Sequence, residues 1–145
     1  MKLVLQRDTL LEYLTGLGRV VPRKSTLPVL QSIRIETDAR SAKISATDLD
    51  QVLSCTVTAI GFDQPGIALV AHDQLLGVVK GAQRGPVTLE AGGGGLDVSY
   101  TLAGQAMTRR LPTLEVTEWP SFGNTVTVSD VDPRFLPTYQ RLAPF

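Results

Sequence analysis

The chain has 145 residues, of which 43% are hydrophobic, and this length and composition favour one domain with a sizeable buried core over a disordered chain. Lys and Arg together number 14, as do Asp and Glu, so contact with nucleic acid would require local segregation of charge. One cysteine, Cys55, cannot form an internal disulfide, and no apolar run approaches the roughly 20 residues of a membrane span, so we expect a cytoplasmic protein without a membrane segment.

A short strand and an amphipathic helix are predicted first. Leu3 and Leu5 begin the strand, and Asp8 can cap the helix that follows. The apolar stripe of this helix consists of Leu10, Leu14, Leu17 and Val21, widened by Leu11. Pro22 is expected to end the helix. Its polar side is expected to carry Arg7, Glu12, Tyr13, Thr15 and Arg19.

Three consecutive strands are predicted between residues 26 and 57. Apolar residues alternate with polar ones in each strand, which is typical of a sheet with one buried face. The inward residues are Ile33 and Ile35, then Ile44 and Ala46, then Leu53, Cys55 and Val57. Because Cys55 follows this alternation, we interpret it as a small buried side chain and not as a reactive thiol.

The second half begins with a turn at residues 63–66, a strand at 67–70 and a helix at about 72–82. The helix carries a stripe of Leu75, Leu76, Val79 and Ala82. A strand from Val87, a turn of glycines at 92–95 and an alternating strand at 96–102 form a predicted hairpin. The last strand is expected at 105–111, with Met107 and Leu111 inward, Arg109 at an edge and Pro112 as its end.

The two halves therefore share one pattern of a strand, a helix and three strands. The pattern appears first at residues 3–57 and again at 67–111, although residue identities do not repeat. The predicted fold class is α+β, a duplicated unit with antiparallel sheets and two helices on one face.

Two short motifs resemble the N-terminal domain of the bacterial DNA polymerase III beta subunit, the sliding clamp. In that family a T-L-P-[VI]-L opening precedes a strand hairpin and a T-D-L-[DE] turn. The corresponding residues here are Thr26, Leu27, Pro28, Val29 and Leu30, then Thr47, Asp48, Leu49 and Asp50. A later passage, with Leu111–Pro112 followed by Trp119–Pro120, resembles the family's interdomain connection, where Phe is more frequent than Trp.

The resemblance implies a DNA clamp fold with clamp domain 1 at residues 1–122. Residues 123–145 would be a linker and the truncated start of a second clamp domain. In that segment Val126 and Val128 resemble a first strand, Asp132 and Pro133 a helix start, and residues 140–145 the middle and exit of that helix. Such a segment would lack its own sheet, so it should be loose or dock its apolar residues on another copy. The 145-residue chain is therefore expected to be a monomer or small homo-oligomer.

No catalytic constellation is evident in the sequence. His72, the only histidine, has no partner at a spacing that identifies a triad, so we interpret it as an ordinary residue at a helix start. Asp48 and Asp50 lack the further ligands of a calcium loop and are interpreted as part of a turn. The glycine run lacks the strand–loop–helix context of a phosphate cradle. We expect no enzyme activity, no cofactor and no metal.

The resemblance also implies that the two helices and their exits face duplex DNA, because the family turns this surface toward the hole of its ring. The DNA-facing candidates are Arg7, Arg23, Lys24, Lys80 and Arg84, with Arg19 a weaker one. Asp8, Glu12 and Asp73 lie nearby and would dilute the positive field, which suits sliding along phosphates better than tight binding.

The leading hypothesis is a noncatalytic processivity-clamp domain that contacts duplex DNA nonspecifically and meets replication proteins or other clamp subunits. The alternative is a clamp-like protein interaction module, or a truncated clamp relative, that does not bind DNA. The salt dependence of duplex binding separates the two, since only phosphate contacts release counterions.

Overall fold

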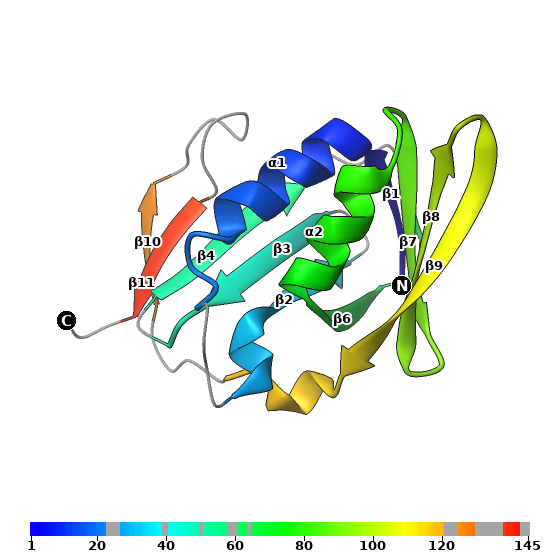
Figure 1. Cartoon of the computed structure of the whole chain (residues 1–145). Coiled ribbons are helices and arrows are strands. Elements are labelled where there is room, and N and C mark those ends of the chain that lie inside the picture. The colour runs from blue at the N-terminus through cyan, green and yellow to red at the C-terminus, as the bar shows by residue number, and fades with distance from the viewer. Residues whose placement is uncertain are drawn as a thin grey trace.

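The computed structural model describes residues 1–22, 27–38, 41–49, 51–57, 61–63, 65–120, 125–129 and 138–142. Two antiparallel helices lie on one face of a curved antiparallel sheet (Figure 1). The first half contains β1 (Lys2–Gln6), α1 (Arg7–Leu17), β2 (Ser32–Thr37), β3 (Ala42–Thr47) and β4 (Gln51–Val57). The second half contains β6 (Gly66–Ala71), α2 (His72–Gly81), β7 (Pro86–Gly92), β8 (Gly95–Leu102) and β9 (Gln105–Leu114). The remaining elements are the 3₁₀ turns η1 (Pro28–Gln31) and η2 (Val116–Glu118) and the strands β5 (Gly61–Asp63), β10 (Thr125–Ser129) and β11 (Thr138–Leu142).

The duplicated unit predicted from the sequence is confirmed, and the strand pairing shows how the halves exchange strands. The order is β10-β11-β4-β3-β2-β6-β9-β8-β7-β1-β5. The first strand of each half therefore pairs with the second strand of the other half: β6 lies beside β2, and β1 lies beside β7. Because each half needs a strand from the other, the two halves form one domain.

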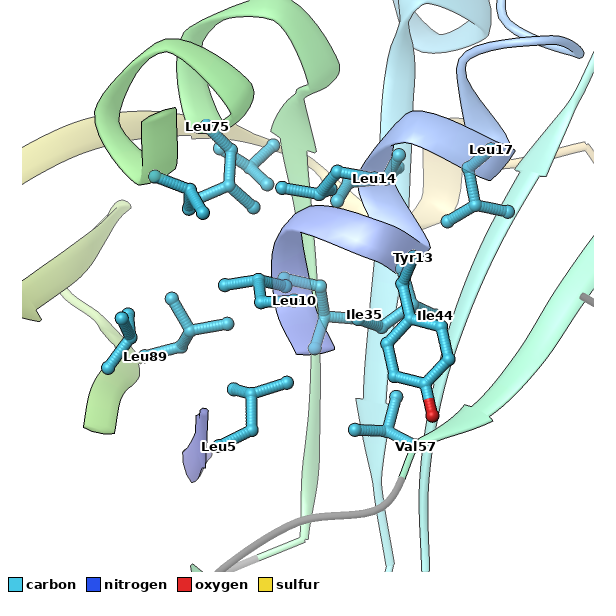
Figure 2. Packing of buried hydrophobic residues seen from close by; sticks show 14 of the residues in the cluster. Leu5, Leu10, Tyr13, Leu14, Leu17, Ile35, Ile44, Val57, Leu75 and Leu89 are labelled. Atoms are coloured by element: carbon cyan, nitrogen blue, oxygen red, sulfur yellow. The ribbon is translucent and has the colours of Figure 1, made fainter. Parts of the chain in front are cut away.

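The core fills the space between the helices and the sheet. Figure 2 shows side chains of α1, α2 and the strands converging on this space. The fully buried side chains include Leu10, Leu14 and Leu17 of α1, Leu75 of α2, and Ile33, Ile35, Ile44 and Leu89 of the strands. A smaller cluster lies apart from this core, where Val29 and Leu30 of η1 contact Leu69, with Leu114 and Trp119 packed against them. Trp119 of the Trp-Pro pair therefore helps to cover the sheet.

Three features of α1 differ from the sequence prediction. Asp8 lies inside the first turn, and the N-cap residue is Gln6, which makes no side-chain cap. The helix ends at Leu17, ahead of Gly18, and not at Pro22. Tyr13, placed on the polar side, is buried, because its ring packs in the core while its hydroxyl donates to the Thr56 carbonyl at 3.4 Å. Neither helix of the described ranges has the length and apolarity to cross a membrane.

The last strand of the second half also differs from the prediction. Pro112 does not stop β9, which continues to Leu114 and passes from pairing with β8 to pairing with β6. At this crossing Pro112 lies opposite Gly95 of β8, and the next residues, Thr113 and Leu114, pair with β6. Met107, predicted inward, is 37% exposed because it lies on the outer part of β9.

The turn between β3 and β4 explains the T-D-L motif. The Thr47 hydroxyl donates to the Gln51 carbonyl at 2.8 Å and accepts from the Leu49 amide at 3.1 Å. The Gln51 amide donates to Asp48 Oδ1 at 2.9 Å. These bonds hold Leu49 at a φ of 80°, which a leucine rarely adopts. Asp48 is thus structural, as predicted, and Asp50 lies outside the described residues.

The segment after η2 forms two strands that extend the sheet at β4. The prediction of a strand around Val126 and Val128 is confirmed by β10. Residues 140–142, predicted to be helical, belong to β11, which pairs with β4 from Thr138 opposite Ser54 to Arg141 opposite Gln51. The expectation that this segment would lack a sheet and be loose or dock on another copy is therefore wrong, because β11 pairs with the edge of β4 in the same chain. The predicted helix start at Asp132 and Pro133 lies outside the described residues.

Candidate nucleic-acid interface

Arg7 ties the beginning of α1 to the end of α2. Its Nε donates to the Val79 carbonyl at 3.1 Å, and its Nη2 donates to the Lys80 carbonyl at 3.1 Å. Its own amide donates to the Gly85 carbonyl at 2.8 Å. The planar guanidinium thus satisfies carbonyls that the last turn of a helix leaves open. The Arg7 side chain is mostly buried, with 20% of it exposed.

His72 makes the corresponding contact at the other end of the helix pair. It is the first residue of α2, is buried, and its Nε2 lies 2.7 Å from the Leu14 carbonyl of α1. Because a carbonyl only accepts, Nε2 carries the proton in this bond. His72 therefore has a structural role at a helix start, in agreement with the sequence interpretation.

Two further DNA-facing candidates, Lys80 and Arg84, lie at the same end of the helix pair as Arg7. Lys80 is exposed in the last turn of α2. The Arg84 side chain is 87% exposed, and its Nε lies 3.0 Å from Asp8 Oδ2. Arg7 Nη1 lies 2.9 Å from the other oxygen, Asp8 Oδ1. The structure therefore brings Arg7 and Arg84 together around one carboxylate at the junction of α1 and α2, with Lys80 in the adjoining last turn of α2.

The rest of the helix surface carries both signs of charge. Glu12 and Asp73 are exposed on α1 and α2, and Arg19 is exposed just after α1. The predicted dilution of the positive field is therefore present on the described surface. Arg23 and Lys24 lie outside the described residues, so their use remains a prediction.

Arg109 is a basic residue of this surface that the sequence analysis placed only at an edge. It pairs across the ladder with Val98, a core residue, and so shares the face of the sheet that carries the helices. Together with Asp73 and Gln74 of α2 it lines a groove of about 380 Å³. The strand period indicated its face, but the alternation could not show that α2 leaves this part of β9 uncovered.

A second groove has about 520 Å³ and lies where α1 ends and α2 begins. Its walls combine Pro22, Pro28 and Pro112 with Gln31, His72 and Asp73. His72 is engaged with the Leu14 carbonyl, and no group of metal-binding side chains occurs among the described residues. The arrangement offers no paired nucleophile and base.

Cys55 is buried in the core between the sheet and α1. Burial raises the pKa of its thiol to about 12, because the thiolate would lose its hydration. The thiol therefore stays protonated at neutral pH, as expected for a packing residue.

Comparison with known proteins identifies a family for most of the chain. The family model described as "DNA polymerase III beta subunit, N-terminal domain" matches residues 1–123. A search of curated proteins gave no significant match.

Solved structures of beta clamps share the fold. The chain matches a Caulobacter crescentus beta sliding clamp with a TM-score of 0.75 and 27% identity over 88% of this chain and 35% of that one. A putative DNA polymerase III beta subunit from Eubacterium rectale gives 0.77 with 18% identity over 89% and 34%. A Helicobacter pylori beta clamp bound to a DNA ligase peptide gives 0.74 with 18% identity over 88% and 36%. The chain thus spans about a third of the length of these clamps.

Proposed function

The chain belongs to the family of the DNA polymerase III beta subunit, N-terminal domain, and we propose on this basis that it acts as a noncatalytic sliding-clamp domain on duplex DNA. The observation that carries the proposal is the match over residues 1–123, together with the duplicated fold and its two helices on one face. We propose residues 1–122 as the first clamp domain and residues 123–145 as a linker and the start of a second. The cytoplasm is its proposed compartment.

The proposed DNA-facing surface is the exposed side of the helix pair, with Arg7, Arg23, Lys24, Lys80 and Arg84. Lys80 and Arg84 are exposed and can reach phosphates. Arg7 already donates to two carbonyls, so we propose that it adds charge and holds the junction in shape. Phosphate contacts of this kind position a protein without reading sequence, as a clamp that slides requires.

Proposed partners are replication proteins or other clamp subunits. The Helicobacter pylori relative is described as bound to a DNA ligase peptide, which shows that one protein of this fold receives a partner peptide. We propose that this chain contacts such partners as part of a larger clamp assembly, and that the 145-residue chain alone is a monomer or small homo-oligomer.

The direct test replaces Lys24 and Lys80 together by glutamate and measures binding to two unrelated duplexes at low salt. Affinity should fall alike on both duplexes, while the melting temperature should change little because Lys80 is exposed. The matched control is the double variant Lys2→Glu with Lys43→Glu, which has the same change of charge on strands β1 and β3. Both control residues alternate with core residues and so lie on the face away from the helices.

Wild-type affinity measured against salt distinguishes the alternative. Phosphate contacts predict that log affinity falls linearly with log salt, by about 0.9 units for each contact. If the helix-face and control variants lose affinity equally, the assignment of the DNA-facing surface is wrong. If the wild type shows no salt-dependent binding at all, a protein interaction module without DNA contact replaces the proposal.

A further inference from the structure

Asp8 bridges two arginines at the junction where α1 begins and α2 ends. Its Oδ1 lies 2.9 Å from Arg7 Nη1, and its Oδ2 lies 3.0 Å from Arg84 Nε. The two arginines differ in their surroundings. Arg7 is 20% exposed and also donates to two carbonyls of α2, whereas Arg84 is 87% exposed and forms an ion pair with Asp8. The carboxylate itself is 51% exposed.

We propose that Asp8 acts as an internal competitor for DNA phosphate at Arg84 and so limits how tightly this junction holds duplex DNA. The inference rests on the proposed function and adds a residue that sets the strength of contact. A carboxylate that forms an ion pair with a guanidinium occupies the position and charge role that a phosphate oxygen would take. Arg84 must then share its charge between Asp8 and an incoming phosphate.

The fixed position of Asp8 makes it an effective competitor. Arg7 holds one of its oxygens, and Arg7 is itself anchored on the Val79 and Lys80 carbonyls, so the carboxylate stays beside Arg84. The pair of Asp8 and Arg84 is exposed, and such pairs are weak enough to exchange. A phosphate can therefore displace the contact, but it meets a reduced positive field. A weak, exchangeable contact is what movement along the duplex requires.

The test is a double-mutant cycle on duplex binding with Asp8→Asn, Arg84→Gln and the double variant. Asparagine keeps the size and an acceptor oxygen but removes the charge. Asp8→Asn should raise duplex affinity roughly three- to fivefold at low salt, the size expected for removing one unit charge at 4–7 Å in water. In the Arg84→Gln background the same substitution should give a clearly smaller gain. Thermal unfolding of each variant checks that the fold is retained.

Glu12→Gln supplies the matched control, because it removes one negative charge from the same helix one turn further on. Glu12 is exposed on α1. A general effect of net charge predicts that Glu12→Gln and Asp8→Asn increase affinity equally and that Arg84→Gln changes neither gain. That result would overturn the competitor role.

The same binding measurements distinguish a failure of the proposed function from a failure of this inference. If the wild type fails to bind duplex at low salt, the DNA-binding function fails together with this inference. If the wild type binds but Asp8→Asn weakens binding or leaves it unchanged, the inference alone fails, since Asp8 would then position Arg84 instead of competing for it. Coupling between Asp8 and Arg84 with stronger binding by Asp8→Asn supports it.

Discussion

Arg7 and His72 occupy the same position in the two halves of the fold, and each binds the last turn of the opposite helix. Arg7 is the first residue of α1 and donates to the Val79 and Lys80 carbonyls of α2. His72 is the first residue of α2 and contacts the Leu14 carbonyl of α1. The duplicated fold thus fastens its antiparallel helices at both ends with different side chains. This fixes the relative position of the surface proposed to face DNA.

Replacing Arg7 by lysine should destabilise the fold by about 1–2 kcal/mol, because lysine keeps the charge but cannot donate to both carbonyls in the planar geometry of arginine. Urea unfolding monitored by circular dichroism measures the change. Arg84→Lys is the matched control, and its cost should stay within about 0.5 kcal/mol because its side chain is 87% exposed. Equal effects at the two positions would show that the Arg7 contacts do not stabilise the junction.

Gly18→Ala should destabilise the protein although its backbone suits alanine. Gly18 has a φ of −60°, where alanine normally stabilises by about 0.4–1 kcal/mol through the unfolded state. An added Cβ would lie 3.1 Å from Cε1 and 3.3 Å from Nε2 of His72, so the imidazole or α1 must shift. We expect a loss of about 1 kcal/mol that shrinks in a His72→Ala background. A stabilised Gly18→Ala protein would mean that this close approach does not occur.

Periodicity predicted the helices and strands that bury one face. It failed where a contact with a distant element determines the position of a residue. The stripes of α1 and α2 and the alternation of the strands locate the core, since apolar burial dominates their placement. Tyr13 was assigned to the wrong side of α1, because its ring is apolar while its hydroxyl needs an acceptor that Thr56 supplies from a distant strand. Pro112 stays within a strand because β9 changes partners there.

The candidate site was predictable in outline only. Charge and helix position indicated Lys80 and Arg84, and the structure places both in exposed positions beside Arg7. The sequence could not show that the Arg7 guanidinium donates hydrogen bonds to α2 carbonyls, because this depends on how the two halves pack. Asp8 was predicted to cap α1, which is a local role. In the structure its carboxylate instead bridges Arg7 and Arg84, which lie far apart in the sequence.

Leu14→Ala should cost about 2–5 kcal/mol, because Leu14 is fully buried between α1 and the sheet and its removal leaves a cavity. Chemical denaturation gives the free energy of unfolding. Val116→Ala, a truncation at a side chain that is 39% exposed, should cost much less. If both truncations cost only a few tenths of a kcal/mol, the Leu14 side chain is not packed in the core.

Cys55 should resist alkylation in the folded protein. Burial raises its pKa from 9.0 to about 12, so the thiolate that reacts with iodoacetamide is scarce at pH 8. The folded state holds this proton more tightly than the unfolded chain does. The resulting stability is therefore present below about pH 9 and is lost as the pH rises toward 12. Mass spectrometry should show rapid labelling in urea and slow labelling without it, and equal rates would contradict the burial.

Removing residues 123–145 should leave a folded domain with an open edge at β4. The main core cluster lies entirely before residue 112, so the truncated chain keeps its packing. Without β11, the outward N–H and C=O groups of β4 lose their partners between residues 51 and 54. Hydrogen exchange should therefore accelerate at the β4 amides that point toward β11, while β2, which has β3 and β6 on its two sides, should exchange as before.

Light scattering should show a monomer or small oligomer for the full chain and more self-association for the truncated one, because an open edge can pair with another copy. Unchanged exchange at β4 would show that β11 does not occupy this edge in solution, and a stable closed hexamer of the full chain would contradict the proposed monomer or small oligomer.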